Sequence, residues 1–231
     1  ISSFFSCKPK SKYLVQKADV VLHNSPESVF ECNKLNVFSN VLHIPCSFDM
    51  HRYKPKAHLQ KDYLTVGWTG TFSSVMYLKS IVPILKDIYS QKKFKLKLIT
   101  NFQYQIEGMD VEVVPWRLES EISDLSDFDI GIYPLFFDDW SKSKGGLKVQ
   151  QYMSMGIPSV STNHGAATHY IDHGETGFLA RNDSDWKKYI LKLIDDLDLR
   201  RSMGRSAREV AEKDFSTDVS ISKYYKIFNE F

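Results

Sequence analysis

Two lysines and two glycines in the second half of the chain have the types and spacing that bind an anion. Lys144 is followed by Gly145 and Gly146, and Lys148 stands two residues beyond them. A glycine-containing loop that opens a helix offers free backbone N–H groups and the positive end of the helix dipole. The two ammonium groups and these N–H groups can therefore converge on one diphosphate, although many charged loops are simply solvated.

A second glycine-containing loop, residues 67–74 (GWTGTFSS), also follows an apolar run and opens a helical pattern. Gly70 allows close approach of the backbone, and the helix start beside Thr71 favours an anion such as a pyrophosphate. The loop lacks the GxGxxG spacing of dinucleotide-binding folds and the GK[ST] of a P-loop. A tight turn without a ligand is an equally good interpretation.

Aromatic and charged side chains follow two other apolar runs. Trp116 and Arg117 place an indole and a guanidinium where a nucleobase can stack, with a partly buried core tryptophan as the alternative. Asp138 and Asp139 have the chemistry to chelate a metal, but helix capping or a surface turn explains them at least as well. No histidine pair has ligand spacing, so we expect no metal site.

These residues all follow short runs that are typical of β-strands and precede segments of helical period. The predicted strands cover residues 19–23, 41–45, 63–68, 96–100, 111–114, 128–133, 158–161 and, at an edge, 178–180. Helical period is clearest over residues 75–88 and 186–197. From Asp62 onward the two kinds of element alternate, which predicts an α/β fold with a doubly wound parallel sheet. Ligands of such sheets bind at the carboxyl ends of the strands.

The chain divides into four predicted parts. Residues 1–47 contain too little for a core of their own and are expected to be the remnant of a preceding domain, followed by a basic linker, 48–61. Residues 62–214 form the doubly wound domain. Residues 215–231 form a last helix that packs back on the N-terminal part, with Ser216 as its N-cap and an apolar stripe of Ile221, Tyr225, Phe228 and Phe231.

Composition excludes several classes of protein. The 231 residues carry 30 Lys+Arg against 28 Asp+Glu, a net charge of +2, and 42% of them are hydrophobic. This balance is typical of a globular chain, so we expect neither a disordered protein nor a nucleic-acid-binding one. The three cysteines show no CxxC spacing, which favours a reducing compartment. No apolar stretch approaches the ~20 residues of a membrane helix.

The motifs, taken together and in order, resemble the C-terminal donor-binding domain of the family 4 (group 1) glycosyltransferases, which have the GT-B fold. The resemblance covers residue 12 to the end of the chain. It is carried by residues 67–71 (GWTGT), 129–135 (DIGIYPL), 138–140 (DDW), 144–153 (KGGLKVQQYM), 156–158 (GIP), 173–180 (HGETGFLA) and 199–204 (LRRSMG), with Ala207 and Arg208 beyond them.

The resemblance implies a retaining transfer of a sugar from a UDP- or GDP-linked donor to a glycan or lipid-linked acceptor. The expected process is the biosynthesis of surface polysaccharide or lipopolysaccharide. A largely missing N-terminal domain would hold the acceptor, and the fragment by itself would be inactive. No cofactor besides the nucleotide sugar is implied. The parent enzyme would be cytoplasmic, in peripheral contact with the inner face of the membrane if its acceptor is lipid-linked.

The resemblance also assigns roles to individual residues. The phosphates are assigned to Gly70 and Thr71, the charge developing on the diphosphate to Lys144 and Lys148, the donor sugar to backbone around Gly145 and Gly146, and the nucleobase to Trp116 and Arg117.

Two glutamates of the family pattern are replaced. Gln151 stands where a glutamate accepts hydrogen bonds from the ribose, and Ser143 stands where another contacts the donor sugar. Glutamine keeps a carbonyl acceptor but loses the charge. Since Gln151→Glu would restore the acceptor of the family, this change is expected to retain or improve donor binding.

Four other functions are compared with the sequence because proteins of related architecture carry them out. The two replaced glutamates suggest a nucleotide-sugar-binding module whose catalysis has lapsed. A nucleotide-sugar 2-epimerase is a further alternative, although the carboxylate acids and bases that it needs are few here. A phosphorylase would need a lysine-bound pyridoxal phosphate, for which there is no motif. A dehydrogenase is disfavoured because no predicted strand is followed by GxGxxG.

Overall fold

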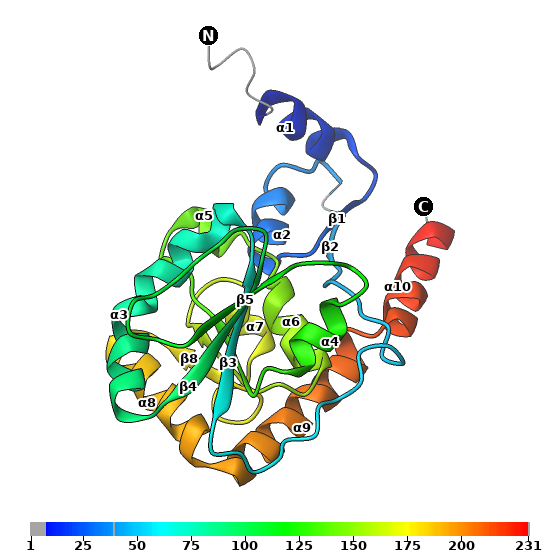
Figure 1. Ribbon diagram of the computed structural model, residues 1–231. Helices are drawn as coiled ribbons and strands as arrows, with labels where there is room; N and C mark the ends of the chain where they lie inside the picture. Colours follow the sequence, from blue (N-terminus) through cyan, green and yellow to red (C-terminus); the bar gives the residue numbers. More distant parts are fainter. Residues whose placement is uncertain (1–7, 39, 231) are drawn as a thin grey trace.

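The computed structural model describes residues 8–38 and 40–230, in which a six-stranded parallel sheet lies between two layers of helices (Figure 1). Its strands are β3 (Leu64–Gly70), β4 (Phe94–Thr100), β5 (Val111–Pro115), β6 (Ile130–Tyr133), β7 (Ser159–Thr162) and β8 (Phe178–Ala180). They lie in the order β5-β4-β3-β6-β7-β8, and every neighbouring pair is parallel. The predicted doubly wound α/β fold is confirmed, and β8 is the edge strand that the sequence indicated.

Helices cover both faces of this sheet. The described helical elements that follow β3 are η1 (Phe72–Ser74), α3 (Val75–Gln91), α4 (Glu121–Ser126), α5 (Asp139–Lys142), α6 (Leu147–Ser154), α7 (Ala167–Tyr170), α8 (Asp183–Asp195), α9 (Leu197–Asp214) and α10 (Thr217–Glu230). Apolar residues of α3 and α8 pack on one face of the sheet. Those of α4, α6, α7 and α9 pack on the other. Covered on both faces, the central strands are mostly apolar.

Two glycines in the central strands allow aromatic rings to pack closely on the sheet. A Cβ at Gly67 of β3 would lie 2.0 Å from the ring of Phe128, and a Cβ at Gly131 of β6 would lie 2.6 Å from the ring of Tyr152. Both rings are fully buried. Packing within the chain therefore explains these two glycines.

The helical period over residues 186–197 is divided between two helices rather than continuous. Asp196 adopts an extended conformation between α8 and α9, and its side chain accepts a hydrogen bond from the backbone N–H of Leu199 at 2.8 Å. Leu197 therefore begins α9 and does not extend α8. An aspartate cap of this kind satisfies N–H groups that a new helix leaves unpaired.

The N-terminal part has its own small sheet. It comprises α1 (Lys8–Lys17), β1 (Val21–His23), α2 (Pro26–Asn33) and β2 (Val41–His43), and β1 and β2 are parallel. A two-stranded sheet is too small to be stable by itself. Contacts with the sheet domain therefore have to contribute to holding this part in place.

Residues 44–63 form no helix, and apart from a bridge between Phe48 and Ser216 they pair with no strand. They are nevertheless bound to the large domain along their length. Lys56 Nζ lies 2.8 Å from Asp129 Oδ1, and the backbone N–H of Lys56 donates to the carbonyl of Met155 at 2.8 Å. The predicted linker 48–61 is thus irregular in structure but firmly attached.

The last helix, α10, begins after Ser216, whose hydroxyl accepts from the backbone N–H of Val219 at 3.4 Å. The predicted apolar stripe does not lie on its buried face. Ile221, Tyr225 and Phe228 are 60%, 72% and 76% exposed, whereas Ile227 is buried. Phe231 lies outside the described residues. The prediction of which side of this helix is covered was therefore wrong, because spacing alone does not say where a partner surface lies.

Candidate functional site at the centre of the sheet

All strands of the sheet are parallel, but the side to which the chain adds successive strands reverses between β3 and β6. From β3 the chain runs outward to β4 and β5, and from β6 it runs outward the other way to β7 and β8. The carboxyl ends of β3 and β6 therefore border a crevice that no connection covers, which is where doubly wound sheets bind ligands. A cavity of about 20 Å³ lies here, and its lining includes Trp68, Tyr133, Lys144 and Lys148.

Lys148 stands in the first turn of α6 among aromatic rings. Its Nζ is 5.9 Å from the centre of the Trp68 ring and 5.5 Å from that of Tyr133. Burial, with a smaller contribution from the charge of Lys144, lowers the pKa of Lys148 to about 8. In the described part of the chain no carboxylate forms an ion pair with it. An anion that enters the crevice would stabilise its charged form.

Lys144 reaches the same cavity from the loop before α6. Its Nζ lies 5.4 Å from the ring centre of Tyr77 and 5.5 Å from that of Trp140, an indole that is 73% exposed. It too makes no ion pair with a described carboxylate. The structure thus brings together the two lysines that sequence spacing singled out.

The two glycines between these lysines have structural reasons of their own. Gly146, the N-cap of α6, has a φ of +72°, in the left-handed region that glycine favours. A Cβ at Gly145 would lie 2.7 Å from the side chain of Asn24. Their assignment to the donor sugar stays a prediction.

Backbone N–H groups of the loop after β3 already form hydrogen bonds within the chain. The backbone N–H of Thr71 donates to Ser74 Oγ at 3.0 Å, and that of Phe72 donates to Asn101 Oδ1 at 3.0 Å. A Cβ at Gly70 would lie 2.3 Å from the Trp68 ring. Two backbone N–H groups that we expected to face a phosphate therefore already have acceptors within the chain. The hydroxyl of Thr71, which lies 2.9 Å from Ser73 Oγ, remains at the crevice edge.

The residues predicted at the nucleobase follow β5. Trp116 is 49% exposed, its backbone N–H donates to the carbonyl of Thr100, and its indole N–H donates to Glu121 Oε1 at 2.8 Å. Its ring is therefore held in place while still reachable. Arg117 is exposed and has no described hydrogen bond. The structure fixes the first of these two side chains and not the second.

Gln151 is buried in the second turn of α6, where its side chain lies near the hydroxyl of Tyr53. The same hydroxyl donates to Glu121 Oε2 at 3.0 Å. Neither Tyr53 nor Glu121 was singled out by sequence, because one lies in the irregular segment and the other in an ordinary polar stretch. No spacing signal could have joined them.

The carboxylate of Asp138 caps a helix. It accepts from the backbone N–H of Ser141 at 2.6 Å, and this bond lowers the pKa of Asp138. Behind it, His164 Nε2 lies 2.9 Å from the carbonyl oxygen of Asp138, so the loop after β7 supports the start of α5. Among the described residues no group of three His, Cys, Asp or Glu side chains is placed to hold a metal ion.

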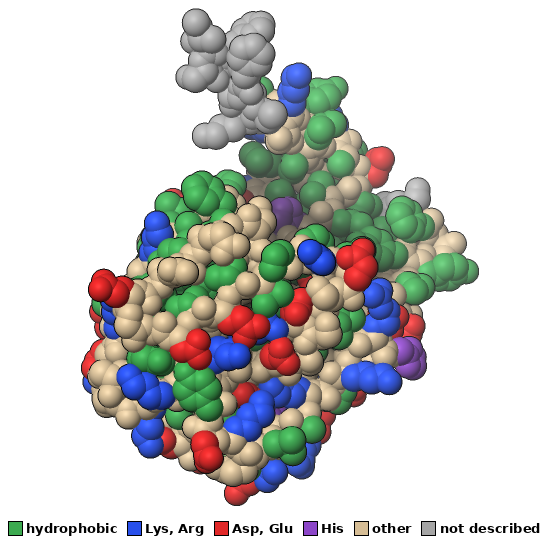
Figure 2. Space-filling model, viewed as in Figure 1, with side chains coloured by type: hydrophobic (Ala, Val, Ile, Leu, Met, Phe, Trp, Pro, Cys, Tyr) green, Lys and Arg blue, Asp and Glu red, His purple; other side chains and the backbone are tan. Residues whose placement is uncertain are grey.

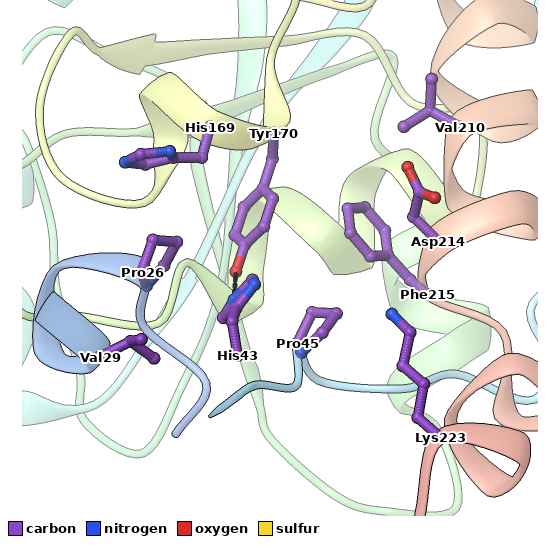
Figure 3. A pocket seen from close by; sticks show the side chains of 10 residues that line it. All are labelled: Pro26, Val29, His43, Pro45, His169, Tyr170, Val210, Asp214, Phe215 and Lys223. Atoms are coloured by element: carbon purple, nitrogen blue, oxygen red, sulfur yellow. Dashed lines mark hydrogen bonds between the residues drawn. The ribbon is translucent and has the colours of Figure 1, made fainter. Parts of the chain in front are cut away.

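The N-terminal part borders the crevice through α2, beside α5 (Figure 1). Glu27 lies 3.3 Å from Lys142 Nζ and 3.4 Å from His169 Nε2. Behind this contact is a cavity of about 380 Å³ between α2, β2, α7, α9 and α10, in which the hydroxyl of Tyr170 lies 3.1 Å from His43 Nε2 (Figure 3). No sequence pattern indicated that these residues would meet.

The comparisons with known proteins agree with this architecture. Residues 63–196 match the family described as glycosyl transferases group 1. The chain belongs to this family. This confirms the resemblance to the donor-binding domain of group 1 enzymes, and the family favours a transferase over the epimerase alternative.

Individual relatives are distant and longer than this chain. The N-acetyl-α-D-glucosaminyl L-malate synthase of Bacillus anthracis is 30% identical over 89 residues, which are 38% of this chain and 23% of the synthase. The capsular polysaccharide biosynthesis glycosyltransferase CapM of Staphylococcus aureus is 22% identical over 200 residues, 79% of this chain and 50% of CapM. The chain therefore spans half or less of the length of these curated relatives.

Solved structures show the same fold. HepE from Anabaena superposes with a TM-score of 0.78 at 16% identity, over 100% of this chain and 69% of HepE. No described helix of the chain is long and apolar enough to cross a membrane.

Proposed function

We propose that this chain binds the nucleoside diphosphate sugar of a glycosyltransferase in the crevice between β3 and β6. The observation that carries the proposal is the convergence of two lysines, Lys144 and Lys148, that have no described carboxylate partner at the start of α6. Two ammonium groups and a helix N-terminus match the charge of a diphosphate. HepE, which shares the fold, was crystallised with UDP and glucose, and this supports a UDP-linked donor.

In the whole enzyme the proposed reaction is a retaining transfer. The bond between the anomeric carbon and the diphosphate oxygen breaks, and a bond from that carbon to an acceptor hydroxyl oxygen forms on the same face of the sugar. The hydroxyl proton leaves with the diphosphate. The departing diphosphate gains negative charge, which Lys144 and Lys148 would counter. The similarity to CapM supports a glycan or lipid-linked acceptor in polysaccharide biosynthesis.

Titration of the chain with UDP and with GDP, followed by calorimetry, tests the binding site. We expect one nucleotide to bind, and Lys148→Ala to weaken its binding by about 1–3 kcal/mol through loss of a charge-assisted contact. Lys86→Ala, which removes an exposed lysine from α3, is the matched control and should leave the affinity unchanged. Failure of both nucleotides to bind, or equal affinity in Lys148→Ala, would contradict the proposal.

A further inference from the structure

A polar cluster lies between α4 and α6, beside the crevice. Glu121, the first residue of α4, accepts from the indole N–H of Trp116 at 2.8 Å and from the hydroxyl of Tyr53 at 3.0 Å. Gln151 of α6 lies near the same hydroxyl. Burial raises the pKa of Tyr53, so its hydroxyl remains a donor at neutral pH. Trp116, five residues before Glu121, and Tyr53, 68 residues before it, thus fix one carboxylate.

The carboxylate of Glu121 is unusual in its partners. It is half-buried, yet no described lysine or arginine forms an ion pair with it. Two donors occupy one oxygen each, and a carboxylate has about four acceptor sites. The group therefore has about two free acceptor positions, fixed in direction by Trp116 and Tyr53.

The position of this cluster relative to Lys148 is suitable for contact with the sugar of a bound nucleotide. Gln151 follows Lys148 by three residues on α6, so the two side chains lie on neighbouring positions of one helix face, about 5–6 Å apart at Cβ. Trp116 lies further out, at the end of the edge strand β5. A nucleotide whose diphosphate contacts Lys148 would have its sugar beside the cluster and its base at the Trp116 ring.

We infer that Glu121, held by Tyr53 and Trp116, accepts hydrogen bonds from the ribose hydroxyls of the bound nucleotide. The inference rests on the proposed function, since it presupposes a nucleoside diphosphate in the crevice. A vicinal diol donates two hydrogen bonds, and these match the two free acceptor positions of a fixed carboxylate. Glu121 then supplies the negative charge that Gln151 lacks.

Glu121 also has a purely structural alternative role, because an acidic residue in the first turn stabilises a helix. The two roles differ in one measurement, the ratio of affinities for a nucleotide and its 2′-deoxy analogue. We expect the unaltered chain to bind UDP, or GDP if that is the nucleotide it prefers, about tenfold more tightly than the 2′-deoxy form. In Glu121→Gln the ratio should fall to less than about threefold. A structural role would weaken both ligands alike and leave the ratio unchanged.

Two controls make this ratio specific. Glu119→Gln removes an exposed carboxylate two residues away and should keep the tenfold ratio. Lys148→Ala should weaken both ligands by the same factor, because it acts on the diphosphate. If UDP and GDP bind with dependence on Lys148 but the ratio does not depend on Glu121, the inference is wrong and the proposed function stands. If neither binds, both fail.

A second test uses Gln151, whose side chain lies near the Tyr53 hydroxyl that donates to Glu121. Gln151→Glu would place two carboxylates against one hydroxyl, and like charges there repel. We therefore expect this single change to weaken nucleotide binding, opposite to the expectation from sequence alone. In the Glu121→Gln background the same change should strengthen binding. An equal effect of Gln151→Glu in both backgrounds would show that the two residues do not share a ligand, and would overturn the inference.

Discussion

At the scale of single residues, the aromatic surroundings of Lys148 make its charge depend on pH. Its pKa is lowered to about 8, mainly by burial, so the side chain is mostly charged at pH 7 and loses its proton within the next two pH units. Only the charged form attracts a diphosphate. A ligand that binds the charged form also raises this pKa, which makes affinity and protonation mutually dependent.

The affinity for UDP or GDP is therefore expected to fall as pH rises through 8. A decline of up to about tenfold per pH unit follows if one proton must be retained. The range from pH 7 to 10 is suitable because the phosphates, with a last pKa of about 6, are already ionised. Calorimetric titration of Lys148→Arg provides the control, since a guanidinium stays charged throughout. Parallel pH profiles for the two proteins would contradict the prediction.

At the scale of elements, the irregular segment before β3 is joined to the sheet domain through a buried ion pair. The side chain of Asp129 is 1% exposed and that of Lys56 is 7% exposed. Asp129 also accepts from the backbone N–H of Thr65 at 2.9 Å and from Lys61 Nζ at 3.1 Å. Replacing Asp129 would leave the buried ammonium group of Lys56 without its carboxylate partner.

We expect Asp129→Asn to lower the free energy of unfolding by about 3–5 kcal/mol, measured by urea denaturation. Burial favours a higher pKa for Asp129, but Lys56, Thr65 and Lys61 outweigh it, so the pKa lies below the ordinary 3.8. The stabilisation is therefore full above the ordinary value and is lost as pH falls through the lower folded value.

The matched control for this ion pair is an exposed one. Asp195 lies 2.8 Å from Lys92, with both side chains about half exposed. Asp195→Asn is expected to cost less than about 1 kcal/mol. Equal losses from Asp129→Asn and Asp195→Asn would show that the attachment of the segment does not depend on the buried pair.

At the scale of the whole molecule, the N-terminal part rests on the sheet domain and keeps large apolar surfaces uncovered. Figure 2 shows hydrophobic side chains gathered over α1, α2 and α10. They include Tyr13, Leu14 and Phe30, each more than 60% exposed. Surfaces of this kind favour a further partner. The division into a domain remnant, a linker, a donor-binding domain and a last helix remains a prediction.

The contact of Glu27 with Lys142 and His169 joins α2 to the crevice side of the sheet domain. Burial acts to raise the pKa of Glu27, but the hydrogen bonds from His169 and Lys142 outweigh it and place the pKa below 4.5. The contact is therefore present above that value and weakens as pH falls through the folded pKa. Because the groups are partly exposed, its stabilisation is under about 1 kcal/mol.

Glu27→Gln is accordingly expected to leave global unfolding nearly unchanged while the amide hydrogens of α2 exchange faster with solvent. Hydrogen exchange detects such local opening at energies well below that of global unfolding. Glu31→Gln is the control, because the ion pair of Glu31 among the described residues is with Lys34, the C-cap of the same helix. Unchanged exchange in α2 for Glu27→Gln would mean that the contact does not hold the two parts together.

Much of the fold could be predicted from the sequence because its signals are local. Apolar runs and helical spacing placed the strands β3 to β8 and the alternation of strand and helix. Lys144 and Lys148 could be paired because one lies in the loop just before α6 and the other in the first turn of that helix. The break at Asp196 and the exposed face of α10 could not be predicted, since continuous spacing is compatible with one helix or two and with either side covered.

The sequence by itself determined the doubly wound sheet, the membership of group 1 glycosyltransferases and the two lysines of the crevice. These follow from residue spacing and order along the chain. Only the tertiary structure decided that Tyr53 and Trp116 both donate to Glu121, and that Thr71 and Phe72 already use their N–H groups within the chain. Such contacts join segments up to 68 residues apart. Their formation depends on how helices pack on the sheet, which no local pattern specifies.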